Sequence, residues 1–493
     1  MATRSTSVVN PENSAVPAHP SPLPLYMALL GTFLLRVGGG IMGILIGLYL
    51  ASKDTEMTNG SSGASPNLSY IITATLVGII TASYFITELG GSFISGNLID
   101  KHGPKRYMIF GPVFGAVAVF MTAALHLRSD SLPLQFVLFL GLLFATRLLE
   151  GAAGATTNPA ALAYIAAFTT GDPKLRSRVS GYFELATLVG AAAGFVFGGR
   201  LFDAFGQGAF LLDAGVYLAS AAIFFFGVRN IVSKEATHTE SHDLRAYRKL
   251  VTAPRLRELI PAWLAVSALL GVLFNHAVFQ LSNGSTRATP EGGGSALRIP
   301  LPGQTLSHAF NGGQVGLVFG LYAVAFGVGI VLWTGIVPRM RKSSIMLISG
   351  TGIIVASFLI ILLNHTGLVE ETNWLRVPLI IAMMIAVMVE SGFTPAALVY
   401  LSDISEQHAE NRGMVMGLYS FLLGFGQLLG SFIAGPFADK AGVDGLLIFM
   451  GILGIISLGG VMLLRRDEVQ THAELGSSTD AQAAKEAVES AAD

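Results

Sequence analysis

The stretch GYFELATLVGAAAGFVFGGRLFDAFG, residues 181–206, has a counterpart in GLYSFLLGFGQLLGSFIAGPFADKAG, residues 417–442. At this offset of 236 positions, 159–162 and 395–398 also match, since both read PAAL. A repeat this long is not a solenoid period and indicates a duplicated membrane half. The shared positions of the two stretches are Gly181, Gly190, Gly194, Gly199, Asp203 and Gly206, which fall on Gly417, Gly426, Gly430, Gly435, Asp439 and Gly442.

The composition indicates a polytopic membrane protein. Of the 493 residues, 52% are hydrophobic and 12% are charged, and the mean hydropathy is +0.62. The formal net charge is -1, and no basic patch of the kind that nucleic acid requires is present. Because the chain has no cysteine, disulfides, thiol nucleophiles and cysteine-ligated metals are excluded.

Twelve apolar runs are each long enough to cross a hydrocarbon core, which needs about 20 helical residues. We therefore expect an all-α fold of twelve transmembrane helices in two pseudo-symmetric six-helix bundles, 23–231 and 258–465. A charged cytoplasmic linker, 232–257, would join them, and the polar segments 1–22 and 466–493 are predicted to be disordered. The runs lie near 23–52, 69–99, 107–126, 133–169, 179–202, 207–231, 259–281, 314–337, 344–364, 375–402, 412–437 and 443–464.

The distribution of Lys and Arg predicts the orientation. One side receives 19 of these residues in or beside its connections and the other side 7. The positive-inside rule therefore places both termini in the cytoplasm. The expected location is a plasma membrane of the bacterial inner-membrane type. The long segment 282–313 would then be external, and the sequence assigns it no role.

A conspicuous cytoplasmic connection reads GNLIDKHGPKR, residues 96–106. It suits a tight reversal in which a carboxylate meets cations or a helix N-terminus. The alternative is a positive-inside loop with a capping aspartate. The matching connection of the second half, GIVPRMRK at 335–342, keeps the glycine and the cations but lacks the aspartate.

This run resembles the loop motif of the major facilitator superfamily, G-x-L-x-D-x-x-G-x-[RK]-[RK]. RLLEG at 147–151 is similar to the R-x-x-x-G motif of its fourth helix, and 181–199 is similar to the antiporter motif of its fifth, with Phe195 in place of a proline. The resemblance implies a transporter of the twelve-helix drug:proton antiporter branch, with a cytoplasmic gate reaching toward 410–413. We expect a monomer without a cofactor. The matching gate residues are Gly96, Leu98, Asp100, Gly103, Lys105 and Arg106.

The glycines of the opening stretch predict close helix packing, because small residues let helix backbones approach each other in lipid. The other interpretation, taken from the family, is a seal on the substrate route that is typical of antiporters. The ladder consists of Gly181, Gly190, Gly194, Gly198 and Gly199.

Charged residues inside the apolar runs are candidates for function, because an ionised side chain in the bilayer is costly unless it is paired or wetted. They form either an internal network that fixes packing or the lining of a central water-filled cavity. In a cavity, Glu150 or Glu390 would exchange a proton, since burial favours the neutral carboxyl and a nearby arginine favours the ionised one. The proton-coupling candidates are Glu150, Glu390, Glu88 and Glu184; the substrate candidates are Arg36, Arg147, Asn275 and His276.

Three functions fit these features. The first is proton-coupled export of small amphipathic compounds, and the second is uptake of an organic anion or another polar metabolite, favoured by Arg36 and Arg147. The third is a membrane sensor. An enzyme is not expected, because the sequence contains no ATP-binding loop, H-E-x-x-H or G-x-S-x-G motif.

Overall fold

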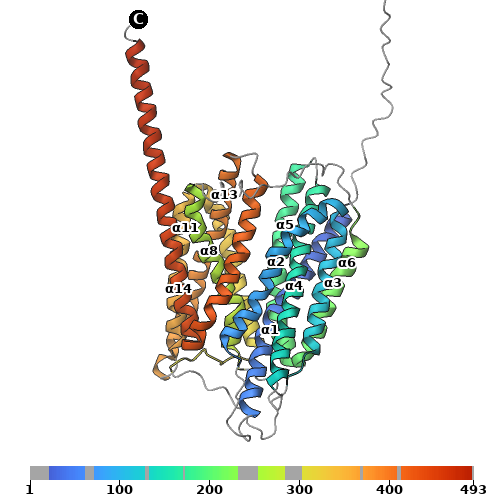
Figure 1. The fold of residues 1–493 in the computed structure, drawn as a ribbon. Helices are drawn as coiled ribbons and strands as arrows, with labels where there is room; N and C mark the ends of the chain where they lie inside the picture. The colour runs from blue at the N-terminus through green and yellow to red at the C-terminus, as the bar shows by residue number, and fades with distance from the viewer. Residues whose placement is uncertain are drawn as a thin grey trace, which may run out of the picture.

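The computed structural model describes residues 22–60, 72–127, 133–169, 172–230, 254–283, 303–366, 370–407 and 412–490. The described part is almost entirely helical and forms two groups of helices that stand side by side, one from each half of the chain (Figure 1). The first group contains α1 (Leu23–Gly60), α2 (Ala74–His102), α3 (Pro104–Ala124), α4 (Pro133–Phe168), α5 (Pro173–Phe205), the short η3 (Gly206–Gly208) and α6 (Ala209–Gly227).

The second group repeats this arrangement with two local breaks. A π-helical turn interrupts its first helix, and Ser391 and Gly392 separate α12 from α13 where one uninterrupted run was predicted. The group contains α8 (Pro254–Val272), η4 (Leu273–Ala277), α9 (Val278–Leu281), α10 (Gly312–Ile336), η5 (Val337–Arg339), α11 (Lys342–Asn364), η6 (Glu370–Leu375), α12 (Arg376–Glu390), α13 (Phe393–Gln407) and α14 (Arg412–Ser490).

Ten stretches of the described residues are long and apolar enough to span a membrane. Two of them, Arg178–Gly227 and Phe421–Arg466, reverse direction at a glycine with positive φ, Gly206 (55°) and Gly442 (57°). A side chain is disfavoured in that backbone conformation, so glycine is required at both turns. Counting the arms of each reversal separately gives a number consistent with the twelve predicted spans.

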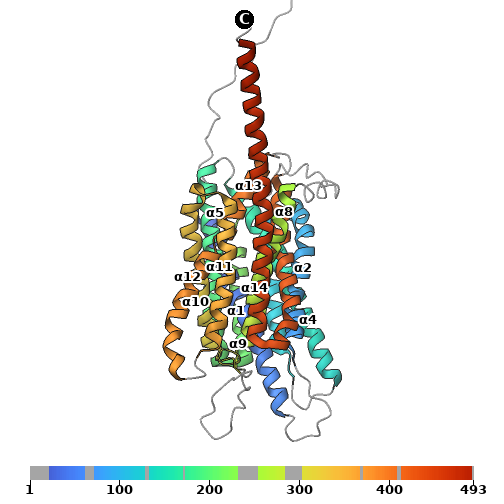
Figure 2. The ribbon, with the colours of Figure 1, turned by 90° about the vertical axis from the view of Figure 1, so that its left-hand side faces the viewer.

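The termini define two sides of the molecule. We call the side at which α1 begins the terminal side, and the opposite side, where α2 and α10 begin, the distal side. On the terminal side α14 extends far beyond the bundles (Figure 2). It is helical to Ser490, whereas a disordered tail was predicted. The Ala- and Glu-rich composition explains the difference, because both residues favour helix.

The hydrophobic core is shared on the distal side and divided on the terminal side. The largest cluster joins both halves, for example Leu45 and Val77 with Val278 and Leu446. Two smaller clusters lie toward the terminal side, and each belongs to one half alone, between Leu25 and Val228 or between Leu256 and Leu464. Among the described residues, the bundles are therefore packed together at one end only.

Candidate functional site

The two halves meet where α5 packs against α10 and α2 packs against α14. At the distal end of the first pair, the Asp203 carboxylate accepts the backbone N–H groups of Gly312 and Gly313 at 2.8 and 2.6 Å. The Asn311 side chain caps the N–H of Gln314, the third residue of the same helix. The first turn of α10 thus has its free donors satisfied from both bundles.

The second pair repeats this geometry. The Asp439 carboxylate accepts the N–H groups of Ala74 and Thr75 at 2.6 and 3.1 Å, while Thr73 caps Leu76 from within the helix. A carboxylate is stabilised at a helix N-terminus, where the backbone dipoles point their positive ends at it. The repeat therefore places one inter-bundle cap at each of the two helix pairs.

Four of the five ladder glycines pack closely, as predicted. Added Cβ atoms at Gly190, Gly194 and Gly198 would lie at most 3.0 Å from the nearest atoms of α1, which is closer than van der Waals contact, and one at Gly199 would meet the Gly312 backbone of α10. Gly181 is different, because no atom of the described residues lies within 4 Å of its Cβ position. The packing prediction is wrong for this residue, which lies toward the terminal side, where the bundles diverge.

Phe195, which departs from the antiporter pattern, fills the junction between the bundles. Its ring stacks on Phe274 at a centroid distance of 5.3 Å and meets Phe319 edge-on at 6.0 Å. Both partners belong to the second half. A proline would leave this aromatic contact empty, so the departure supplies packing across the interface.

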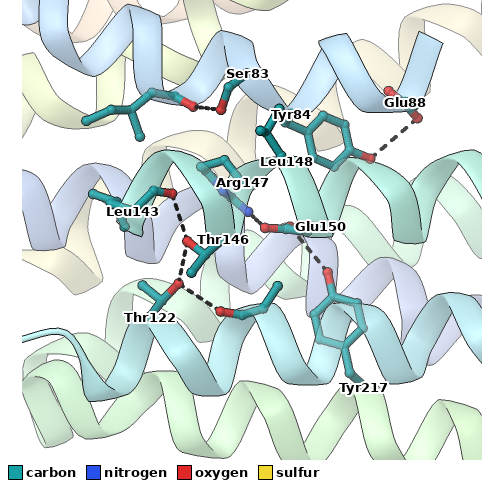
Figure 3. A network of polar contacts seen from close by, with 12 residues as sticks. Ser83, Tyr84, Glu88, Thr122, Leu143, Thr146, Arg147, Leu148, Glu150 and Tyr217 are labelled. Carbon is teal, nitrogen blue, oxygen red and sulfur yellow. Dashed lines mark hydrogen bonds and ion pairs between the residues drawn. The ribbon is translucent and has the colours of Figure 1, made fainter. Parts of the chain in front are cut away.

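Arg147 and Glu150 form an ion pair on one face of α4 (Figure 3). Both side chains are buried, and the Tyr217 hydroxyl of α6 donates to Glu150 at 3.5 Å. The pair thus lies inside the first bundle, between α4 and α6. This placement matches the predicted internal network better than the predicted cavity lining.

A second polar chain in the same bundle is only half-buried. The Arg36 guanidinium donates to the Asn158 side-chain oxygen at 3.0 Å, and the Asn158 amide donates to Glu88 at 3.5 Å. The Tyr84 hydroxyl reaches the same Glu88 oxygen at 3.4 Å (Figure 3). The sequence analysis missed Asn158, although a polar amide in an apolar run gives the same kind of signal as the charges do.

Glu184 is exposed near the terminal side of α5, and no hydrogen bond or ion pair of its side chain is found in the described part of the chain. It differs from Glu88 in exposure but not in its neighbouring cation, because the Arg36 charge attracts both carboxylates.

Glu390 is the carboxylate of the second bundle. It is 5% exposed, ends α12 at the helix break, and accepts a 2.8 Å hydrogen bond from Tyr322. Tyr322 and Tyr84 both lie ten positions after the first residue of their helices, α10 and α2. Each half therefore presents a tyrosine hydroxyl to a carboxylate at an equivalent depth.

Asn275 and His276 lie in the π-helical turn, a feature that often marks functional positions. Asn275 donates to the Ser431 hydroxyl at 2.5 Å, and the His276 Nε2 atom lies 2.6 Å from the Ser431 carbonyl oxygen. His276 is 0% exposed, and its contact with Ser431 fits the local hydrogen-bonding role.

The gate motif forms the predicted tight reversal. Gly103 has φ 82° and ends α2, and α3 begins at Pro104. Lys105 lies over the Phe225 ring at 5.8 Å, while Arg106 is exposed and Gly96 has nothing within 4 Å of its Cβ position. The Asp100 side chain and the predicted partner segment around 410 fall outside the described residues.

Among the residues that were described, no three His, Cys, Asp or Glu side chains come together as a metal site would require. Several ionisable groups are instead held by another charge, by a tyrosine or by a helix terminus, as Glu150, Glu390 and Asp203 are.

Comparisons with known proteins agree with this architecture. The Major Facilitator Superfamily model matches residues 28–287 and 292–490. Multidrug resistance protein 1 of Bacillus subtilis (strain 168) is 28% identical over 162 residues, which are 32% of this chain and only 37% of that relative.

The solved structures similar to this chain include the nucleoside transporter NupG, with TM-score 0.64 and 13% identity over 90% of this chain and 98% of that one. A D-xylose-proton symporter has TM-score 0.61 and 13% identity over 90% and 97%. At this identity the two structures establish the fold alone.

Proposed function

The chain belongs to the Major Facilitator Superfamily and is a multi-pass membrane transporter, not an enzyme; we propose that it exports small amphipathic compounds in exchange for protons. The observation that carries this proposal is the core that both halves share on the distal side and divide on the terminal side. Two bundles that rock about a midplane site require such an arrangement in one of their two states. We assign the distal side to the exterior and both termini to the cytoplasm of a plasma-membrane monomer.

The distal contacts are the ones that must separate when the transporter opens outward. They include polar caps and glycine backbones, as at Asp203 with Gly312 and Gly199 with Gly316, beside the apolar cluster that both halves share. Polar caps can exchange a backbone donor for water, so opening leaves no buried group unpaired.

Proton coupling is supported by the carboxylates that lie within the membrane span. Glu390 is buried with one tyrosine and lies at a helix break, where a small backbone movement would change its surroundings. Glu150 shares its environment with an arginine. Carboxyl groups placed in this way gain or lose a proton as their hydration and partners change.

Export of amphipathic compounds is supported by the name of the multidrug relative and by the aromatic side chains beside Glu390. Phe274, Tyr322 and Phe326 form consecutive ring contacts at 6.4 and 5.9 Å. All three are half-buried, on the helices that adjoin the first bundle. Such a surface suits a substrate that carries both an apolar ring system and a polar or cationic group.

The test is transport of a fluorescent cationic dye by purified protein in liposomes. We expect an imposed pH gradient to drive the dye against its concentration gradient, and Glu390→Gln to abolish this uphill movement. Dye movement equal to that of empty liposomes, for wild type under either gradient direction, would refute the proposal.

A second function, uptake of an organic anion, is favoured by Arg36. This guanidinium is half-buried and donates to the neutral Asn158 amide, and the carboxylates that its charge attracts, Glu88 and Glu184, do not form an ion pair with it in the described part of the chain. It could therefore pair with a substrate carboxylate or phosphate. Accumulation of an anion by the liposomes, abolished in Arg36→Ala, would support this function over dye export.

A further inference from the structure

Asp213 is a buried carboxylate in the middle of the first bundle that the transport scheme above leaves unused. It lies on α6 and is 0% exposed. Neither of its carboxylate oxygens has a hydrogen-bond partner among the residues that the structure describes. It stands four positions before Tyr217, so both side chains lie on the same helix face.

The charged and titratable groups around Asp213 come from the helices packed on α6 and from α4. Arg147 of α4 is the cation whose charge attracts the carboxylate. From α1, Gly38 approaches so closely that an added Cβ would lie 3.3 Å from the Asp213 Oδ1 atom, while Arg36 acts on Tyr217. Three further ionisable groups of the described residues lie near this position: Glu150 of α4, Tyr217 of α6 and Tyr84 of α2. On α3, the sequence from Tyr107 to Ala124 contains no ionisable side chain after Tyr107. On α5, the carboxylate of Glu184 is exposed.

The two buried acids, Glu150 and Asp213, differ in the partners that surround them. Glu150 has the Arg147 ion pair and the Tyr217 hydroxyl, whereas Asp213 has only the attraction of the same arginine. One guanidinium cannot neutralise two carboxylates. A buried ionised acid without a partner is unfavourable, so the surplus acid binds a proton.

We propose that Asp213 is a proton-binding site of the first bundle, neutral while Arg147 is paired with Glu150. On release, the Asp213 O–H bond breaks and the proton passes to water that reaches the cluster as the bundles move. The ionised carboxylate then competes with Glu150 for Arg147. The assignment of Asp213 to transport coupling rests on the proposed function, but its protonation does not.

Infrared spectroscopy of the purified protein tests the protonation without any substrate. We expect a carboxyl C=O band whose intensity falls as the pH rises. Asp213→Asn should remove this band, and Asp213→Glu should shift it. Asp444→Asn is the matched control that should retain it, because Asp444 lies in the other half and is held by Asn364 and His365. A band that persists unchanged in Asp213→Asn at every pH would overturn the assignment.

Dye transport separates this assignment from the proposed function. We expect Asp213→Asn to exchange dye across the membrane while losing at least about tenfold of its pH-driven uphill transport. Wild-type-like uphill transport in this variant would refute the coupling role of Asp213 alone. A wild type that moves dye without protons would refute proton coupling altogether, whatever the infrared band shows.

Discussion

Asp203 and Asp439 occupy equivalent positions in the two halves, and each accepts the first two backbone N–H groups of a helix in the other half. The repeat in the sequence is therefore also a repeat of contacts. The two aspartates hold α10 and α2 on the distal side, where the common core lies.

We expect Asp203→Asn and Asp439→Asn each to favour the outward-open state. Each aspartate accepts one N–H group on each of its two oxygens, whereas an asparagine has one amide oxygen and an NH2 group that cannot accept. Each substitution therefore loses the charge and one of the two hydrogen bonds, and it should remove about 1–2 kcal/mol from distal closure, a factor of about 5–30. The measurement is labelling of a single distal cysteine, which is simple here because the chain has no cysteine of its own. A labelling rate equal to that of the unsubstituted background would contradict the role of the caps.

Gly199→Leu should prevent distal closure and stop transport. The position faces the Gly312 backbone of α10, and overpacking costs about 1–3 kcal/mol, or about 5–150-fold in an equilibrium. Gly181→Leu is the matched control from the same stretch, with open space around it. Equal dye transport by the two variants, at equal amounts of folded protein, would be the contrary result.

Tyr322→Phe should weaken proton-driven transport without abolishing substrate binding. The substitution removes the 2.8 Å hydrogen bond to Glu390, and a hydrogen bond to a charged group contributes about 1.5–3 kcal/mol. Dye binding and uphill dye transport should be measured on the same preparation. Thr334→Val, which removes an exposed hydroxyl bonded within its own helix, controls for loss of a polar group. A Tyr322→Phe protein with unchanged uphill transport would exclude this tyrosine from coupling.

Arg147→Met should destabilise the protein more than the double substitution with Glu150→Gln. The single variant leaves Glu150 buried without its cation, which costs about 3–5 kcal/mol, whereas removing both charges is close to neutral. Unfolding of the purified protein in denaturant gives the two free energies. A double variant that is less stable than Arg147→Met would show that the unpaired Glu150 charge is not what destabilises the single variant.

Much of the fold could be predicted from the repeat and the apolar runs. The two halves, the tight turn at Gly103 and the packing of Gly190 and Gly194 follow from local sequence. The break at Ser391 was missed although Pro395 stands four positions later, where its ring opposes a helical hydrogen bond to the Ser391 carbonyl. The π-helical turn at 273–277 has no such signal in the sequence.

Most charged residues of the candidate site could be predicted from the sequence, but the contacts that they make with one another could not. The charged residues were found, since charge in an apolar run is easily detected, yet Asp213 was missed although the same criterion applies to it. The sequence also could not separate groups inside a bundle, such as Glu150, from exposed ones, such as Glu184. That distinction depends on helix rotation, which neighbouring helices determine.

The central claim is that the two bundles rock, so that the distal side opens as the terminal side closes. Distances between spin labels at exposed positions test it most directly, with His126 and Trp374 labelled on the distal side and Arg106 and Arg341 on the terminal side. Comparing the unsubstituted background with Gly199→Leu needs no ligand. We predict that the distal distance increases and the terminal distance decreases in the variant. Two distances that change in the same direction, or not at all, would contradict the claim.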